Sequence, residues 1–265
     1  MTEAPDVQPA DARKWIRSLP LVVAPQAKIL LRLVEAAEAD PRIRALEIRG
    51  SIARGTADEH SDLDTLLRIS DDHYEAALID MPSLARSISP TIDILFETPG
   101  SPYLFVQFAD GVQLELSSRR ASEATGLAPG VVVLLDRDGL LDERREPDAP
   151  WDQDLWIGWA WMALFDIDKH LRRGSLWKAL TTLEKARSLL LRHHAATSGV
   201  RDPEFGITSL LDYGAGLPDR LEETVARLDA DAIRRAAYAC AEILATYEQR
   251  PFGEFVLARL KRDSI

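Results

Sequence analysis

Two carboxylates with a single residue between them are the feature of the sequence best suited to catalysis. Asp62 and Asp64 flank Leu63 and precede the apolar pair Leu66-Leu67, a pattern that predicts a strand with both acids on one face. Carboxylates held side by side repel each other and lose hydration unless a cation lies between them. Hard divalent ions such as Mg²⁺ bind such oxygen ligands, usually together with substrate phosphates. The pair therefore predicts a magnesium site.

A Gly-Ser dipeptide ends the predicted strand that comes before this pair. Gly50 has no Cβ, so the backbone there can turn sharply and let a ligand come close. Ser51 adds a hydroxyl and a backbone N–H, and N–H groups at a strand-to-helix turn favour phosphate oxygens. A phosphate-binding turn beside paired carboxylates is what metal-assisted nucleotidyl transfer requires.

The order and spacing of these residues resemble a known signature. Gly50-Ser51, Arg54-Gly55-Thr56 and Ser61-Asp62-Leu63-Asp64 resemble the DNA polymerase β-type nucleotidyltransferase superfamily, and within it the bacterial antibiotic nucleotidyltransferases. The resemblance implies an α+β fold, with a mixed sheet flanked by helices and followed by an α-helical bundle. It implies ATP as substrate, Mg²⁺ held by the two acids, and an aminoglycoside or lincosamide as acceptor. The nucleotide-binding residues that it implies are Gly50, Ser51, Arg54 and Ser61.

A third acid on a later strand completes the site in enzymes of this superfamily. Glu115, in the alternating segment 112–117, is the preferred candidate, and Asp93 in segment 91–97 is the alternative. An acid flanked by apolar residues within a strand needs a partner, which a metal ion or a substrate hydroxyl would supply. Whether the third acid is a metal ligand or the base that deprotonates the acceptor stays open, because a Glu can do either.

The periodicity of apolar residues divides the chain in two. Strand patterns and helical patterns at 11–18, 24–39 and 71–85 follow a polar tail within residues 1–140, which we expect to be the nucleotidyltransferase domain. A charged, proline-bounded segment, residues 141–150, is predicted to be a linker. Residues 151–265 carry helical spacing throughout and predict a bundle of about five helices that binds the acceptor.

Acidic residues on the predicted bundle are candidates for acceptor binding, namely Asp166, Asp168 and Glu184. They lie on or beside a tryptophan-rich helical pattern at 151–172. Arg187 and His193 also have the spacing of HEPN-type ribonuclease domains, although Arg and His near a helix end equally suit the helix dipole. Cys240, the only cysteine, lies in an apolar run and is expected in the core.

Composition narrows the possible partners. The 265 residues carry a net charge of −11 and no basic run, which disfavours non-specific nucleic-acid binding. We see neither a signal peptide nor an apolar stretch that could span a bilayer, and expect a cytoplasmic protein. The hypothesis is an adenylyltransferase acting on a small-molecule hydroxyl and conferring antibiotic resistance. The alternatives are a regulatory, antitoxin-like binding module and a nucleotidyltransferase that acts on a protein. The residues do not decide between ATP and GTP, and they do not indicate the oligomeric state.

Overall fold

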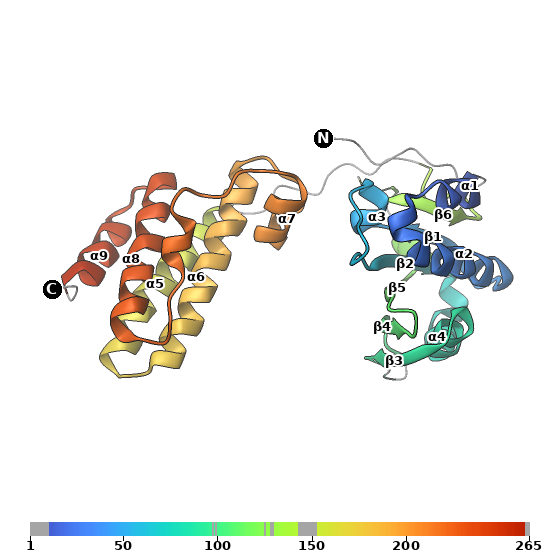
Figure 1. Cartoon of the computed structure of the whole chain (residues 1–265), viewed down its shortest axis with the longest axis horizontal. Coiled ribbons are helices and arrows are strands. Elements are labelled where there is room, and N and C mark those ends of the chain that lie inside the picture. Colours follow the sequence, from blue (N-terminus) through green and yellow to red (C-terminus); the bar gives the residue numbers. More distant parts are fainter. Residues whose placement is uncertain are drawn as a thin grey trace. The chain divides into compact units, whose positions relative to one another are not determined.

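The structure, a computed structural model, describes residues 11–96, 98, 100–124, 126–127, 130–142 and 153–262. The chain forms two compact units, residues 1–148 and 149–265, which are coloured from blue to green and from yellow to red in Figure 1. Most of the predicted linker 141–150 lies outside the described residues. A membrane-spanning segment would need a longer or more apolar helix than any in the described ranges.

A mixed six-stranded sheet forms the centre of the first unit, as the resemblance implied, with the strand order β3-β4-β5-β2-β1-β6. The pairing of β2 with β5 is parallel, and the other four pairings in the described sheet are antiparallel. The strands are β1 (Ile43–Ile48), β2 (Leu63–Ile69), β3 (Thr91–Leu95), β4 (Tyr103–Phe108), β5 (Gln113–Arg120) and β6 (Val132–Asp136).

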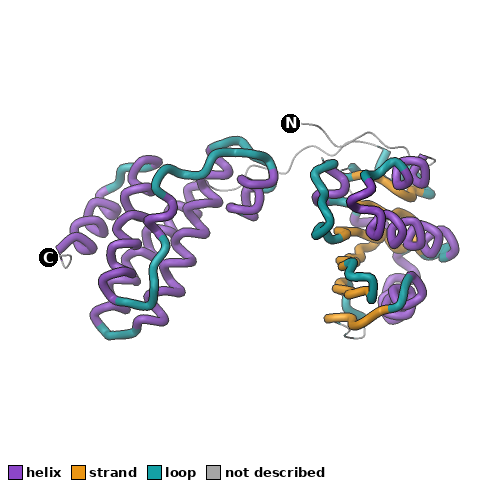
Figure 2. The backbone as a smooth tube through the Cα atoms, in the orientation of Figure 1, coloured by secondary structure: helices purple, strands orange, loops and turns teal. Residues whose placement is uncertain are grey.

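Two long helices, α2 (Ala24–Ala39) and α4 (Tyr74–Ile88), pack on the sheet and on each other, and Figure 2 shows them on one side of the strands. The predicted apolar stripe of α2 is fully buried at Ile29, Leu30 and Leu33. It packs against every second side chain of the strands, including Leu63 and Leu114. The residues that alternate with these, Asp64 and Glu115 among them, therefore lie on the other face of the sheet. The shorter helices are α1 (Ala12–Arg17) and α3 (Gly50–Arg54).

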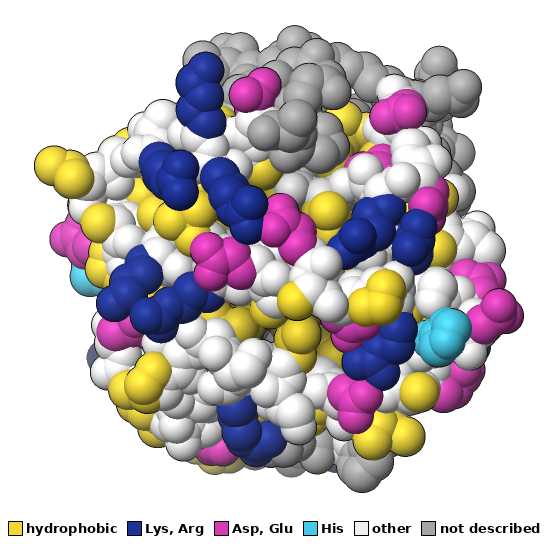
Figure 3. All heavy atoms as spheres, turned by 90° about the vertical axis from the view of Figure 1, so that its right-hand side faces the viewer, with side chains coloured by type: hydrophobic (Ala, Val, Ile, Leu, Met, Phe, Trp, Pro, Cys, Tyr) yellow, Lys and Arg dark blue, Asp and Glu magenta, His cyan; other side chains and the backbone are white. Residues whose placement is uncertain are grey.

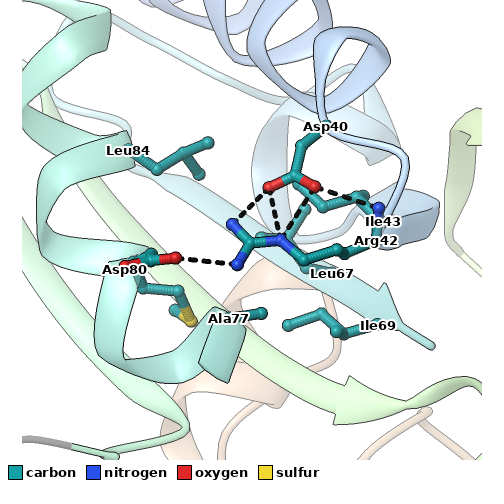
Figure 4. Close-up of a pocket in the computed structure, with 9 residues that line it drawn as sticks. Asp40, Arg42, Ile43, Leu67, Ile69, Ala77, Asp80 and Leu84 are labelled. Atoms are coloured by element: carbon teal, nitrogen blue, oxygen red, sulfur yellow. Dashed lines mark hydrogen bonds and ion pairs between the residues drawn. The ribbon is translucent and has the colours of Figure 1, made fainter. Parts of the chain in front are cut away.

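Arg42 ties the α2–β1 connection to α4. Its guanidinium lies 2.7 Å from an Asp40 oxygen and 2.7 Å from an Asp80 oxygen, as Figure 4 shows. The hydrogen bond to Asp40 is the main reason why the pKa of Arg42 is raised. The pocket beside this cluster has a volume of only about 20 Å³, far below the size of a nucleotide site. We therefore assign this cluster a structural role.

The surface of the first unit mixes charges. Figure 3, which views this unit from the right-hand side of Figure 1, shows basic side chains interspersed with acidic ones. This face therefore does not carry the continuous basic stripe that is typical of a nucleic-acid-binding surface.

The second unit is an α-helical bundle, as predicted. Its helices are α5 (Gln153–Arg172), α6 (Leu176–Thr197), α7 (Ile207–Asp212), α8 (Ala230–Tyr247) and α9 (Pro251–Arg262). Trp161 and Cys240 lie in its core, and burial raises the pKa of the Cys240 thiol to about 12. Cys240 is thus the core residue that the sequence predicts.

Three local features differ from what apolar periodicity alone predicts. Helical spacing at 217–228 predicts a helix, but the structure has only a 3₁₀ turn, Leu221–Thr224, and Arg220 just before it has a left-handed φ of 64°. Helical spacing places Trp159 inward, but it is 52% exposed. Alternation along 91–97 places Ile92 on the same face as Ile94, but a register shift between Thr91 and Asp93 leaves Ile92 69% exposed.

Candidate functional site

The parallel pairing of β2 with β5 brings two of the predicted acids together. Asp64 and Glu115 are direct partners in the register of this pairing, so their Cα atoms are about 5 Å apart. Asp62 lies one residue before β2 and two before Asp64. All three acids are half-buried. Residues 51 positions apart in the sequence thus form one acidic group.

The charges of Asp62 and Glu115 act on Asp64. Burial, followed by the charges of Asp62 and Glu115, raises the pKa of Asp64 to about 6. The nearby guanidinium groups of Arg54 and Arg49 act in the opposite direction. A carboxylate whose charge is disfavoured by burial and by like charges gains from a bound cation.

The donor set fits Mg²⁺ in its chemistry, since it consists of carboxylate oxygens, which this ion prefers together with phosphate oxygens. Among the described residues, no three His, Cys, Asp or Glu side chains stand close enough together to form a ready-made metal cluster. The assignment of Asp62, Asp64 and Glu115 as metal ligands is therefore a proposal, developed below.

Asp93, the alternative third acid, lies far from this group. It is exposed on β3, at the edge of the sheet, and its carboxylate accepts a hydrogen bond from the N–H of Ile94, 2.8 Å away. Three strand-to-strand steps of about 4.8 Å separate β3 from β2, which amounts to roughly 14 Å. The structure therefore favours Glu115.

The Gly-Ser turn lies directly against the acids. Gly50 begins α3 with a left-handed φ of 68°, and a Cβ placed there would overlap the Asp64 carboxylate. The N–H of Arg49 donates to the backbone oxygen of Asp64 at 2.9 Å. Ser51 is half-buried in the first turn of this short helix, and Arg54 is its last residue.

Ser61 makes hydrogen bonds within the turn that precedes Asp62. Its hydroxyl accepts a hydrogen bond from the Asp58 N–H at 2.9 Å and donates to the Asp58 carboxylate at 3.1 Å. Gln26 of α2 donates to the backbone oxygen of Ser61 at 2.9 Å. Ser61 thus closes the turn that leads into Asp62, and these bonds give it a structural role in addition to the predicted role in nucleotide binding.

Tyr103 is a residue of this group that the sequence did not reveal. It begins β4, next to β5. Burial, followed by hydrogen bonding with Glu115, raises the pKa of Tyr103. The alternation within 103–108 places Tyr103 on a face, but only the pairing of β4 with β5, which sets Tyr103 opposite Ser117, brings it within two residues of Glu115.

On the bundle, ion pairs account for the three acids predicted to bind the acceptor. Asp166 pairs with Lys169 at 2.6 Å, and Glu184 pairs with Arg187. The Asp168 side chain is 2% exposed and binds Arg172 at 3.0 Å as well as Arg259. Burial alone would raise the pKa of Asp168, but these two arginines lower it. We therefore assign Asp168 to the fold of the bundle and no longer to the acceptor site.

The HEPN-like pair is also engaged in packing. Arg187 donates to the backbone oxygen of Thr224 at 2.9 Å. His193 is buried, with its ring edge-on to Tyr247 at a centroid distance of 5.1 Å. These contacts give both residues a structural role.

A groove on the bundle surface offers a different place for a small molecule. Its volume is about 440 Å³, within the range of ligand sites. Trp159 and Met162 contribute exposed apolar surface, and the ammonium of Lys185 lies 5.8 Å from the Trp159 ring centre. The lining residues are Asp154, Leu155, Gly158, Trp159, Met162, Arg250 and Phe252.

Comparison with known proteins agrees with this geometry. Residues 29–117 match the family model described as "Nucleotidyltransferase domain", a range that runs from α2 into β5 and contains both carboxylates of the β2–β5 pair. This part of the chain is a nucleotidyltransferase domain, and the protein is an enzyme of the nucleotidyltransferase class.

Solved structures give only distant resemblances. An aminoglycoside 6-adenyltransferase from Bacillus subtilis is 15% identical, with a TM-score of 0.37, and the match covers 89% of this chain and 95% of that one. Terminal uridylyl transferase 4 from Trypanosoma brucei with bound UPU is 17% identical, with a TM-score of 0.30 and coverage of 91% and 74%. No curated protein matches. Similarity at this level says nothing about the substrate.

Proposed function

We propose that this protein transfers a nucleoside monophosphate, AMP from ATP in the first instance, to a hydroxyl group of a small molecule. The observation that carries the proposal is the direct register of Asp64 with Glu115, with Asp62 two residues upstream and the Gly50 backbone against the Asp64 carboxylate. These residues lie inside the matched nucleotidyltransferase domain.

Each residue has a role in this proposal. Asp62 and Asp64 hold Mg²⁺, and Glu115 either completes that site or accepts the proton of the acceptor hydroxyl. Gly50 and Ser51 admit the phosphates to the backbone, and Arg54 offsets their negative charge. The metal ion supplies electrostatic stabilisation of the charge that develops on the phosphate oxygens. The acceptor oxygen forms a bond to the α-phosphorus, the bond from that phosphorus to the bridging oxygen breaks, and pyrophosphate leaves.

Tyr103 supports the base role of Glu115. Burial and the interaction with Glu115 raise the pKa of Tyr103, so its phenol stays protonated and can hold the Glu115 carboxylate in position by donating to it. Glu115 can then accept a proton once the acceptor hydroxyl lies within hydrogen-bond distance.

The bundle groove supports a proposal for the acceptor class. We assign the acceptor to an aminoglycoside or a lincosamide, and the groove supports the second more strongly. Its apolar wall around Trp159 suits a ring or an alkyl chain, and Asp154 suits a single protonated amine. A polycationic aminoglycoside would need more unpaired acids than this groove provides in the residues that the structure describes. Modification of either drug class would confer antibiotic resistance.

The test is release of pyrophosphate, measured for the four nucleoside triphosphates against a panel of aminoglycosides and lincosamides, with Mg²⁺ and with EDTA. We expect activity with ATP and at least one acceptor, and none in EDTA. If no pair of nucleotide and acceptor releases pyrophosphate above the level of the Asp62→Asn, Asp64→Asn double variant, small-molecule transfer is contradicted.

A further inference from the structure

A buried ionic cluster lies on the same face of the sheet as the acids. Glu47 of β1 is 1% exposed, and each of its carboxylate oxygens accepts a hydrogen bond from one arginine. Arg68 Nε of β2 donates to Oε1 at 2.8 Å, and Arg49 Nη2 donates to Oε2 at 3.0 Å. No motif in the sequence marks Glu47 or Arg68.

The cluster has more positive than negative charge. Two guanidinium groups share one carboxylate, so the cluster carries one positive charge in excess. Arg49 Nε and Arg68 Nη1 are buried and have no hydrogen-bond partner within the described part of the chain. Buried donors without a partner cost free energy, and an anion would satisfy both the charge and the geometry.

Only one member of the cluster reaches the surface. The side chains of Glu47 and Arg68 are 1% and 6% exposed, whereas that of Arg49 is 43% exposed. A guanidinium has five N–H donors, and Arg49 gives one of its terminal nitrogens to Glu47. Its Nε is buried, so the second terminal nitrogen, Nη1, is the donor left for a ligand at the rim of the cluster.

The position of Arg49 relates this rim to the candidate site. Arg49 directly precedes Gly50, and its N–H is bonded to the backbone oxygen of Asp64 at 2.9 Å. Its charge also acts on the Asp64 carboxylate. Arg49 thus lies beside the proposed metal ligands. In the sequence it precedes the Gly-Ser turn, whereas Arg54 follows it.

We propose that Arg49 binds the terminal phosphates of the nucleoside triphosphate, and that Glu47 and Arg68 are positioning residues that hold its guanidinium in place. This inference rests on the proposed function. The fork of donors on an arginine matches two phosphate oxygens, and its anchor on a buried carboxylate lowers the entropy lost when phosphate binds.

Calorimetric titration of the full chain tests this inference without any acceptor. The probes are Mg-ATP, inorganic tripolyphosphate with Mg²⁺, and AMP, which lacks the terminal phosphates. We expect Arg49→Gln to weaken binding of Mg-ATP and tripolyphosphate by about tenfold or more and to leave AMP affinity unchanged. Arg49→Lys should recover part of the loss. Arg44→Gln is the matched control, since Arg44 lies on β1, five residues before Arg49, but pairs with Asp138.

The positioning role has its own variant, Glu47→Asp, which keeps the charge but shortens the side chain. We expect weaker tripolyphosphate binding with unchanged AMP binding. Equal loss for AMP and tripolyphosphate in both variants would show that the cluster only maintains the fold, and would overturn the inference. So would wild-type affinity for tripolyphosphate in Arg49→Gln. If the wild-type protein binds neither Mg-ATP nor tripolyphosphate, the proposed function itself fails, and the inference fails with it.

Discussion

Gly50 and Asp64 contact each other so closely that a Cβ on the first would overlap the carboxylate of the second. Gly50 also has a φ of 68°, a conformation that L side chains rarely adopt. Glycine is therefore required here for two independent reasons, one conformational and one steric. This contact fixes the phosphate-binding turn against the proposed metal ligand.

Alanine variants of Gly50 and Gly55 should separate the conformational effect of a side chain from its steric effect. Gly50→Ala should abolish transfer, because the new methyl group displaces the Asp64 carboxylate. Gly55→Ala is the matched control, with a similar φ of 72° but nothing within 4 Å of its Cβ. It should cost only about 1 kcal/mol of stability and keep most of the activity. Thermal unfolding and turnover of both variants give the measurement, and equal activity in the two would contradict the contact.

Removal of both strand-face acids should abolish transfer without loss of the fold. In the Asp62→Asn, Asp64→Asn double variant the metal ligands are gone, while the repulsion that raises the Asp64 pKa is also gone. We expect a melting temperature equal to or above that of the wild type in EDTA. Activity retained at saturating Mg²⁺ would refute the metal assignment.

The raised pKa of Asp64 predicts opposite effects of pH on stability and on metal binding. Its value of about 6 exceeds the ordinary value of 3.8, so the folded metal-free protein binds the proton more tightly than the unfolded chain does. Stability in EDTA should therefore fall by about 1 to 2 kcal/mol as pH rises from 4 to 6, after discount for solvent screening. Asp64→Asn should remove this fall.

Affinity for Mg²⁺ should change in the other direction. Below pH 6 the ion competes with a proton on Asp64, so its affinity should drop by up to about tenfold per pH unit. Titration of Mg²⁺ at several pH values provides the measurement. A metal affinity that does not change between pH 5 and pH 7 would show that Asp64 is not a ligand.

The two candidates for the third acid give different outcomes. Glu115→Gln should lower turnover by on the order of 10² or more. Mg-ATP affinity should stay within about tenfold if Glu115 acts mainly as the base, and fall further if it is a metal ligand. Asp93→Asn, on the edge strand, should leave both unchanged. An inactive Asp93 variant beside an active Glu115 variant would reverse the assignment.

The bundle groove predicts an effect on the acceptor alone. Trp159→Ala should raise the acceptor KM by about tenfold through lost apolar and cation–π contact, with no change in ATP affinity. Trp177→Ala is the control, because Trp177 is 72% exposed and is not among the residues that line the groove. Equal acceptor KM values in the two variants would place the acceptor elsewhere.

The sequence predicted the fold class and most helices and strands, because the apolar periodicity of segments such as α2 and β4 is strong and their boundaries are marked by Pro, Gly or Asp. It predicted Asp62, Asp64 and Gly50 as neighbours because they lie within one strand–turn–strand unit. The roles of Tyr103 and Glu47 could not be predicted, because they depend on strand pairing, which periodicity alone does not determine.

The sequence also does not show which charged side chains are buried. Asp168 and Arg49 are both charged residues in amphipathic segments. The Asp168 side chain is buried between two arginines, whereas the Arg49 side chain is partly exposed and pairs with the buried carboxylate of Glu47. Only the packing of neighbouring elements decides which charge is available to a ligand. Whether the acidic residues of the bundle are free to bind a ligand was therefore the hardest feature to predict from the sequence.

The single parallel pairing in the described sheet also has a consequence for how the enzyme acquires its activity. Strands β3, β4 and β5 are antiparallel neighbours in sequence, and so are β1 and β2, and such local hairpins form early in folding because little loop entropy opposes them. The β2–β5 ladder joins these two pieces, with Asp64 on one and Glu115 on the other. A nascent chain thus has no complete acidic group until the pieces dock, and local opening of this ladder would switch off catalysis while both hairpins stay folded.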